Sequence, residues 1–253
     1  MSSPYEGAPV AEWPGITARL VAEHPLSLAV IHDVALEAWH QVWKTAIGTP
    51  PDAIPLCEID PPAQIVGHFF EKLMARVLAN RFPGAWRGTS ERNEKDLVYL
   101  PNSIFSIEIK SSGQLGLRVF GNRSYGQELT EGGKTSKPQR SGYFITANFF
   151  DRDLVLLRFG WIDHTDWIPQ KSATGQMAGL RSEIYQYKLV PILGEYRLSA
   201  PIELLDGVGR KTAETLSALG IHTIGDLLKY EGSDHRIKRF KEVAAVAYPP
   251  SAS

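Results

Sequence analysis

Charged residues interrupt two β-rich runs in the segment Glu94–Ser112, which reads EKDLVYLPNSIFSIEIKSS. Asp96 opens the first run, and Glu108 and Lys110 end the second. Because side chains alternate across a strand, Glu108 and Lys110 point to one face and the isoleucines between them point to the other. A sheet interior favours apolar side chains, so we expect these charges to be paired, exposed or bound to a ligand.

Two of these side chains have the chemistry of a divalent-metal site. If the two runs form a hairpin, Asp96 approaches Glu108 across it, and clustered carboxylates repel unless a cation lies between them. Such oxygen ligands suit Mg²⁺, which is usually held by one or two carboxylates plus a substrate phosphate. Lys110 can then orient or deprotonate a water, or stabilise charge that develops on phosphorus. The alternative is an exposed ion pair between Glu108 and Lys110, worth under about 1 kcal/mol.

Helices and strands are expected around these residues. Residues 26–47 and 63–81 have apolar residues recurring at intervals of three and four, which is typical of amphipathic helices, and the second helix carries Glu71. Residues 111–142 are expected to form a polar, glycine-rich loop, and residues 1–15 are expected to be poorly ordered. The expected strands are residues 96–100, 104–110, 143–150 and 154–162.

Composition limits the class of protein. The chain has 253 residues, 43% hydrophobic and 22% charged, which fits one large domain or a domain with a small module. No apolar run reaches membrane-spanning length and no secretory signal is evident, so we expect a cytoplasmic protein without a membrane partner. Cys57 is the single cysteine, which excludes an internal disulfide and a cysteine-based zinc site.

The formal net charge of −1 conceals local basic patches, because Lys and Arg gather in residues 110–140 and 229–241. Such patches on a nearly neutral chain can mark a footprint on phosphates, and solvated surface is the alternative for each of them.

Asp96 followed by Glu108-Ile109-Lys110 resembles the signature of the PD-(D/E)XK nuclease superfamily, with Lys95 in place of the proline. The resemblance implies that Asp96 and Glu108 bind Mg²⁺ and that Lys110 assists the attacking water. It also implies a supporting role for a glutamate on an upstream helix, a position that Glu71 occupies.

The downstream residues Gly121–Gln127, GNRSYGQ, together with EIKSS, are similar to type II restriction endonucleases of the ScaI kind. This resemblance implies an α/β, restriction-endonuclease-like core, in which helices flank a mixed central sheet. It implies hydrolysis of double-stranded DNA to 5′-phosphate and 3′-hydroxyl ends by a homodimer. Such folds usually place a helix between the third and fourth strands, and residues 111–142 show no clear pattern for it.

Three residues of this segment are candidates for reading DNA bases. Arginine pairs with guanine, and asparagine and glutamine pair with adenine, in the major groove. The candidates are Asn122, Arg123 and Gln127. Phosphate contacts or plain surface positions are the alternatives for each of them.

A second motif lies in residues 201–230, PIELLDGVGRKTAETLSALGIHTIGDLLKY, which resembles a helix-hairpin-helix. Glycines allow backbone N–H groups to point outward at a helix N-terminus, where the helix dipole favours a phosphate. The predicted contacts are Gly207, Val208, Gly209, Arg210 and Lys211. A protein–protein contact is the alternative use of this motif.

The chain is therefore predicted to have three parts. Residues 1–198 form the endonuclease domain with an N-terminal helical extension, residues 199–247 form a small all-α DNA-binding module, and residues 248–253 form a disordered tail.

Two other functions compete with a restriction endonuclease. A structure-selective repair nuclease also combines a nuclease with a helix-hairpin-helix. That group usually shows Glu-Arg-Lys-x-x-x-Asp, whereas residues 108–114 read EIKSSGQ and lack both the Arg and the Asp. The other alternative is a DNA-binding module whose carboxylates are structural.

Overall fold

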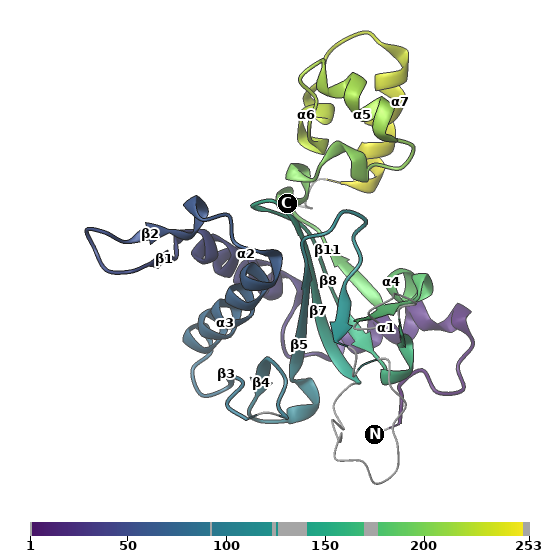
Figure 1. Ribbon diagram of the computed structural model, residues 1–253. Helices are drawn as coiled ribbons and strands as arrows, with labels where there is room; N and C mark the ends of the chain where they lie inside the picture. The colour runs from purple at the N-terminus through teal and green to yellow at the C-terminus, as the bar shows by residue number, and fades with distance from the viewer. Residues whose placement is uncertain (1, 92, 123–124, 126–140, 170–176, 250–253) are drawn as a thin grey trace.

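A six-stranded mixed sheet forms the centre of the protein in a computed structural model, which describes residues 2–91, 93–122, 125, 141–169 and 177–249 (Figure 1). The strand order is β11-β8-β7-β5-β4-β3, with β5 and β7 parallel and the other neighbours antiparallel. The predicted mixed central sheet is confirmed. Its strands are β3 (Trp86–Gly88), β4 (Leu97–Tyr99), β5 (Ile107–Ser112), β7 (Gly142–Phe150), β8 (Asp153–Ile162) and β11 (Leu189–Ile192).

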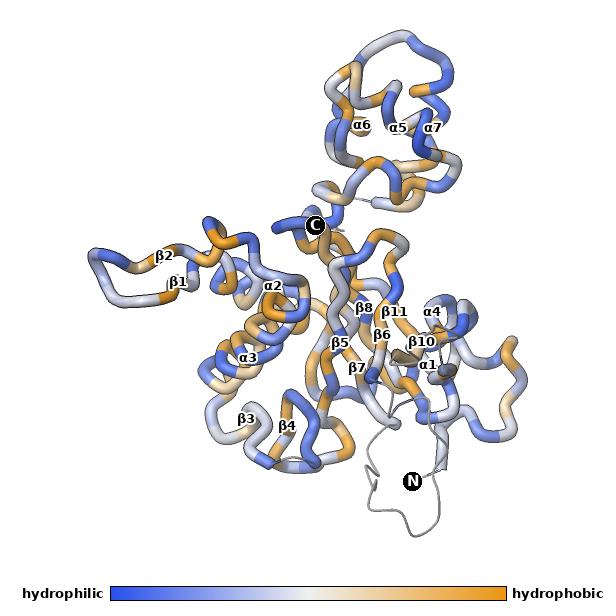
Figure 2. The backbone as a smooth tube through the Cα atoms, viewed as in Figure 1, coloured by the Kyte–Doolittle hydropathy of each residue, from blue (hydrophilic) through white to orange (hydrophobic). Residues whose placement is uncertain are grey.

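Three helices cover one face of this sheet: α1 (Trp13–Glu23), α2 (Leu28–Lys44) and α3 (Ala63–Arg81). The apolar stretches of α2 and α3, orange in Figure 2, pack with the isoleucines and aromatic residues of β5, β7 and β8 into one buried core. Both predicted amphipathic helices are confirmed. The first begins two residues later than its pattern suggests, because the Ser27 hydroxyl caps it by accepting a hydrogen bond from the Val30 N–H at 3.3 Å.

A small antiparallel sheet lies over the other face, with strand order β6-β10-β9. Side chains from both sheets, including Phe144, Ile162 and Trp167, form a separate core there. Glu108 and Lys110 project to this side, because they alternate with the buried Ile107 and Ile109. The added elements are β6 (Phe120–Asn122), β9 (Trp167–Pro169), β10 (Met177–Leu180) and α4 (Ser182–Tyr187).

The expectation of a continuous loop over residues 111–142 is wrong in part. Ser111 and Ser112 extend β5, Phe120–Asn122 form β6, and Gly142 begins β7. Parallel β5 and β7 require a crossover connection, and this segment supplies it. In the parts of the crossover that the structure describes, residues 113–122, 125 and 141, β6 is present and the helix typical of such folds is not.

The N-terminal residues are ordered against the core, so the expectation of disorder is wrong for those that the structure describes. Tyr5 is 5% exposed and its hydroxyl lies 2.8 Å from the Thr17 hydroxyl. The ring of Tyr5 lies 4.2 Å from the Nζ of Lys188, and the ring of Trp13 lies 4.6 Å from it. Cation–π attraction to a buried ammonium therefore holds a segment whose Pro and Gly content suggested disorder.

Lys188 lies in a buried ion cluster. Its Nζ contacts Asp163 Oδ2 at 2.9 Å and Asp166 Oδ2 at 2.9 Å, and all three side chains are at most 3% exposed. The Ser3 hydroxyl donates to Asp163 Oδ2 at 2.7 Å, which ties the N-terminal segment to the same cluster.

Replacing Lys188 with methionine should destabilise the fold, because two buried carboxylates would lose their cation. We expect the free energy of unfolding to fall by about 3–5 kcal/mol, measured by urea denaturation. Arg81→Met, which breaks the exposed pair with Glu37, is the matched control and should cost under about 1 kcal/mol. Equal losses in the two variants would contradict a structural role for this cluster.

The C-terminal residues form short helices beyond one end of the sheet (Figure 1). Their core includes Ile202, Leu216, Ile224 and Leu227, and Val155 of β8 is buried in it as well. Two short helices span Arg210–Ser217 and Ile224–Lys229, and a further helix with several basic residues follows them. The helices are η7 (Ile202–Leu204), α5 (Arg210–Ser217), α6 (Ile224–Lys229) and α7 (His235–Ala247).

The remaining elements are short. A two-stranded hairpin projects from the end of α2, and single 3₁₀ turns join the larger elements. None of the helices that the structure describes is both long and apolar enough to cross a bilayer. These elements are β1 (Ala46–Ile47), β2 (Ile54–Pro55), η1 (Val10–Glu12), η2 (Leu56–Glu58), η3 (Ser103–Phe105), η5 (His164–Asp166) and η6 (Glu195–Ser199).

Candidate active site

A gap between β4 and β5 places the first carboxylate. The two strands pair at Leu97 and Ile107, and the next outward-facing N–H of β5, that of Ile109, donates to Asp96 Oδ2 at 2.7 Å instead of to a strand carbonyl. The Asp96 carboxylate therefore replaces a strand at this point and is fixed beside β5 by a charge-assisted hydrogen bond.

Glu108 and Lys110 contact each other on the adjoining face of β5. The Lys110 Nζ donates to Glu108 Oε1 at 2.6 Å and to the Ile109 carbonyl at 3.2 Å. Their side chains are 15% (Glu108) and 17% (Lys110) exposed, so both remain reachable from solvent. The predicted same-face placement of the Glu-x-Lys pair is what the structure has.

Glu71 lies on α3, near enough to Asp96 for its negative charge to help raise the pKa of that carboxyl. Gly67, one turn earlier on the same face of α3, lies against Ser111 of β5 so closely that a Cβ atom would overlap its hydroxyl. The Glu71 carboxylate itself contacts the Lys72 Nζ at 2.6 Å. The structure therefore brings Asp96, Glu108 and Lys110 together, with Glu71 at the edge of the cluster and bound to a neighbouring lysine.

The charges of the cluster perturb one another. Burial, reinforced by the negative charge of Glu108, raises the pKa of Asp96 to about 7. Burial also opposes ionisation of Glu108, but the adjacent Lys110 ammonium outweighs it and lowers the pKa of that carboxyl. Burial disfavours the charged form of Lys110, and Glu108 overcomes it, so the pKa of Lys110 is raised.

The donor set fits a magnesium ion. Two carboxylates lie close enough that the ionised form of one suppresses ionisation of the other, which is the situation a divalent cation relieves. No group of three or more His, Cys, Asp or Glu ligands occurs among the described residues. Mg²⁺ does not require one, because it keeps waters and takes substrate phosphate oxygens to complete its shell. The residues that would hold it are Asp96 and Glu108.

The raised pKa of Asp96 predicts a pH-dependent stability. Between its ordinary pKa of 3.8 and about 7, the folded state holds a proton that the unfolded state has lost, so stability falls as pH rises through this window. In EDTA, Asp96→Asn should therefore raise the melting temperature at pH 8 and leave it unchanged near pH 4. Asn keeps an acceptor for the Ile109 N–H. A destabilised Asp96→Asn protein at pH 8 would contradict this electrostatic account.

Two residues at the site were not assigned a role from the sequence. Lys95 is 5% exposed, and its Nζ lies 5.0 Å from the ring centre of Phe144. The Nζ donates a long hydrogen bond of 3.4 Å to the Tyr143 carbonyl. Burial lowers the pKa of Lys95 to about 8. Tyr125 donates its hydroxyl to Glu108 Oε1 at 2.7 Å. Its neighbours in GNRSYGQ are the predicted base readers. Only the three-dimensional structure links the tyrosine to Glu108.

The predicted base readers are described only in part. Asn122 is exposed at the end of β6, where it pairs with Met177 of β10. Arg123 and Gln127 lie outside the residues that the structure describes.

The two glycines of the C-terminal hairpin differ in backbone conformation. Gly207 has φ +82°, a left-handed conformation that favours glycine, whereas Gly209 has φ −86° and caps α5. Val208 is buried in the module core. Lys211 is exposed, and the Arg210 side chain, which is 93% exposed, pairs with Glu214 at 3.2 Å.

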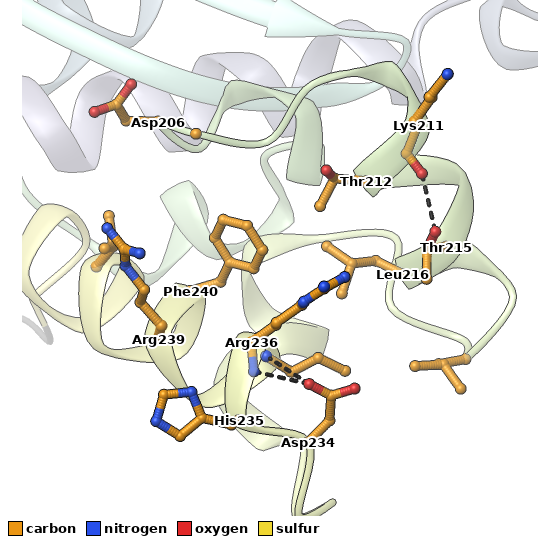
Figure 3. A pocket seen from close by; sticks show the side chains of 14 residues that line it. Asp206, Lys211, Thr212, Thr215, Leu216, Asp234, His235, Arg236, Arg239 and Phe240 are labelled. Atoms are coloured by element: carbon orange, nitrogen blue, oxygen red, sulfur yellow. Dashed lines mark hydrogen bonds between the residues drawn. The ribbon is translucent and has the colours of Figure 1, made fainter.

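A groove of about 740 Å³ lies beside this hairpin, between α5 and α7. Figure 3 shows Phe240 projecting from α7 into the space between the helices and Arg236 reaching toward Thr215 and Leu216 of α5. Lys211, Arg236 and Arg239 line it, and none of these three makes an ion pair with any residue that the structure describes. The groove thus combines apolar residues with three basic side chains and with the carboxylates of Asp206 and Asp234.

The fold and the site together define a restriction-endonuclease-like nuclease: a mixed sheet flanked by helices, an Asp beside one strand and a Glu-x-Lys on that strand. The family model for the ScaI restriction endonuclease matches residues 3–193. The chain is also 35% identical over 198 residues to the type II restriction enzyme ScaI of Streptomyces caespitosus, which covers 75% of this chain and 84% of that protein.

The chain therefore belongs to the ScaI restriction endonuclease family, and its class is that of the type II site-specific deoxyribonucleases. No solved structure gives a significant match. The family match ends at residue 193, so α5, α6 and α7 lie beyond it.

Proposed function

We propose that the chain is a Mg²⁺-dependent type II restriction endonuclease that hydrolyses phosphodiester bonds at a specific site in double-stranded DNA. The observation that supports the chemistry is the meeting of Asp96, Glu108 and Lys110 beside one strand in a chain of this family. Asp96 and Glu108 would hold the metal, and Glu71 would support them from α3.

Each residue has a distinct part in this mechanism. When bound, Mg²⁺ supplies Lewis-acid stabilisation of the charge that develops on the phosphoryl oxygens. Lys110 is a hydrogen-bond donor to Glu108, and an ammonium group has no lone pair with which to take a proton. Its part is therefore to orient the attacking water and to stabilise negative charge, rather than to act as the base while the ion pair is intact.

Cutting both strands of a duplex in one binding event takes two such sites. Each chain offers one cluster of this kind, so we propose that a homodimer acts on a palindromic sequence, one subunit per strand. We also propose a cytoplasmic location, which agrees with the single Cys57 and the lack of any disulfide requirement.

Asp96→Ala and Lys110→Ala should abolish cleavage and leave DNA binding in place, because each removes charge stabilisation that matters mainly in the transition state. We expect the cleavage rate to fall by at least about 10²-fold, measured on a plasmid with and without Mg²⁺, with DNA binding followed by gel shift. Asp52→Ala, in the loop between β1 and β2, is the matched control. Retained cleavage by purified Asp96→Ala would refute the assignment.

The same plasmid digestion separates the competing functions. A restriction endonuclease gives discrete fragments with defined ends, and a structure-selective nuclease cuts forks or flaps and leaves plain duplex intact. A non-catalytic DNA-binding module gives no cleavage in any metal.

We further propose that residues 199–247 form a helix-hairpin-helix module that binds the DNA backbone. Gly207 and Gly209 would present N–H groups to a phosphate, since the N–H of Val208 already donates to the Leu205 carbonyl at 3.0 Å. The basic residues of the α5/α7 groove would extend that contact. Arg236 and Arg239 add charge that the motif alone does not include. Such contacts are independent of sequence and sensitive to salt.

Lys211→Gln/Arg239→Gln should lower the salt sensitivity of binding to DNA that lacks the recognition site. Each lost phosphate contact reduces the slope of log K against log salt by about 0.9, so the double variant should lose about two. Fluorescence anisotropy of the full chain in EDTA measures this slope. Lys229→Gln/Lys238→Gln removes the same charge from the same module at positions that do not line the groove. Equal slopes for the two double variants would contradict a groove contact.

A further inference from the structure

We propose that Tyr125 is a positioning residue for the nuclease reaction, which sets the oxygen of Glu108 that faces the metal and holds the Lys110 ammonium beside it. The proposal rests on the proposed function of Asp96, Glu108 and Lys110.

Tyr125 contacts both members of the Glu-x-Lys pair. Its hydroxyl donates to Glu108 Oε1 at 2.7 Å, and its ring centre lies 5.2 Å from the Lys110 Nζ. The Lys110 Nζ donates to the same Oε1 at 2.6 Å. One carboxylate oxygen therefore receives two donors, whereas Oε2 receives none from the residues that the structure describes.

The tyrosine has little freedom to move. It is 5% exposed, and its ring packs on Trp167 of β9 with 4.9 Å between the ring centres. Gly121 of β6 borders both rings, and a Cβ atom there would come within 3.0–3.1 Å of Tyr125 and Trp167. A side chain larger than hydrogen at position 121 would therefore displace the ring, which means that the small sheet fixes the hydroxyl against Glu108.

This arrangement orients a metal ligand from outside the metal's own shell. A carboxylate oxygen that accepts two hydrogen bonds, as Oε1 does, is a poor ligand for a cation. The other oxygen, Oε2, is therefore the one directed to Mg²⁺. A partner that hydrogen-bonds a ligand fixes its rotamer, and loss of such a partner typically costs about 10–100-fold in metal affinity or activity. Packing alone would explain the ring of Tyr125, but it would not require the hydroxyl to lie on a carboxylate.

Tyr125→Phe tests the hydroxyl while keeping the ring. We expect the Mg²⁺ concentration for half-maximal cleavage to rise about 10-fold or more, with a smaller change in the rate at saturating Mg²⁺. Independently of cleavage, the rise in melting temperature on adding Ca²⁺ should be smaller than in the wild type. Tyr125→Leu, which also removes the ring from Lys110, should show a larger shift of both quantities.

Tyr185→Phe is the matched control. Its hydroxyl lies in the same layer and bonds to the backbone of Val119, at 3.0 Å to the N–H and 3.3 Å to the carbonyl, without contacting the cluster. It should leave the Mg²⁺ requirement and the Ca²⁺ effect unchanged.

The outcomes separate this proposal from the proposed function. An inactive Asp96→Ala protein together with a wild-type Mg²⁺ requirement in Tyr125→Phe would overturn the role of Tyr125 alone. A fully active Asp96→Ala protein would overturn both. If Tyr125→Phe melts far below the wild type in EDTA, the rise of its own melting temperature on adding Ca²⁺ decides: a rise as large as that of the wild type overturns the proposal.

Discussion

The hydrogen bond from the Ile109 N–H to the Asp96 carboxylate is the contact on which the site depends. It exists because β4 pairs with β5 at a single residue pair, Leu97 and Ile107. Beyond that pair the N–H of Ile109 has no carbonyl of β4 opposite it and needs another acceptor. A buried N–H without an acceptor would be costly at that position. An ionised carboxylate is a stronger hydrogen-bond acceptor than a neutral carbonyl. The need to complete the sheet and the need to place a metal ligand are thus met by one side chain.

The local part of this site was predictable from the sequence. A strand period of two puts Glu108 and Lys110 on one face whatever the rest of the fold does, and the apolar spacing of α3 fixes its bounds. Tyr125 was not predictable, because it reaches Glu108 through a crossover whose path no local pattern determines. The order of the N-terminal residues could not be predicted from the sequence for a related reason. Tyr5 is held by a lysine 183 positions away, whereas the residues next to Tyr5 favour turns.

The two faces of the central sheet have different tasks. The face under α2 and α3 is a continuous apolar core, and its close contact between Gly67 and Ser111 leaves α3 no room to shift relative to β5. The opposite face combines a smaller core with the charged cluster. A rigid support on one side and a polar, partly reachable surface on the other suit chemistry that needs ligands held in fixed positions.

The C-terminal helices join the rest of the chain where their two ends meet, and their buried core also includes Val155 of β8. Arg197, before the first of them, donates to the Ala247 carbonyl at 3.1 Å, and its guanidinium lies 4.6 Å from the ring centre of Tyr248. The residues at the two ends of this unit therefore lie side by side. A rotation of the unit as a rigid body would therefore have to break both this contact between its ends and the packing on Val155.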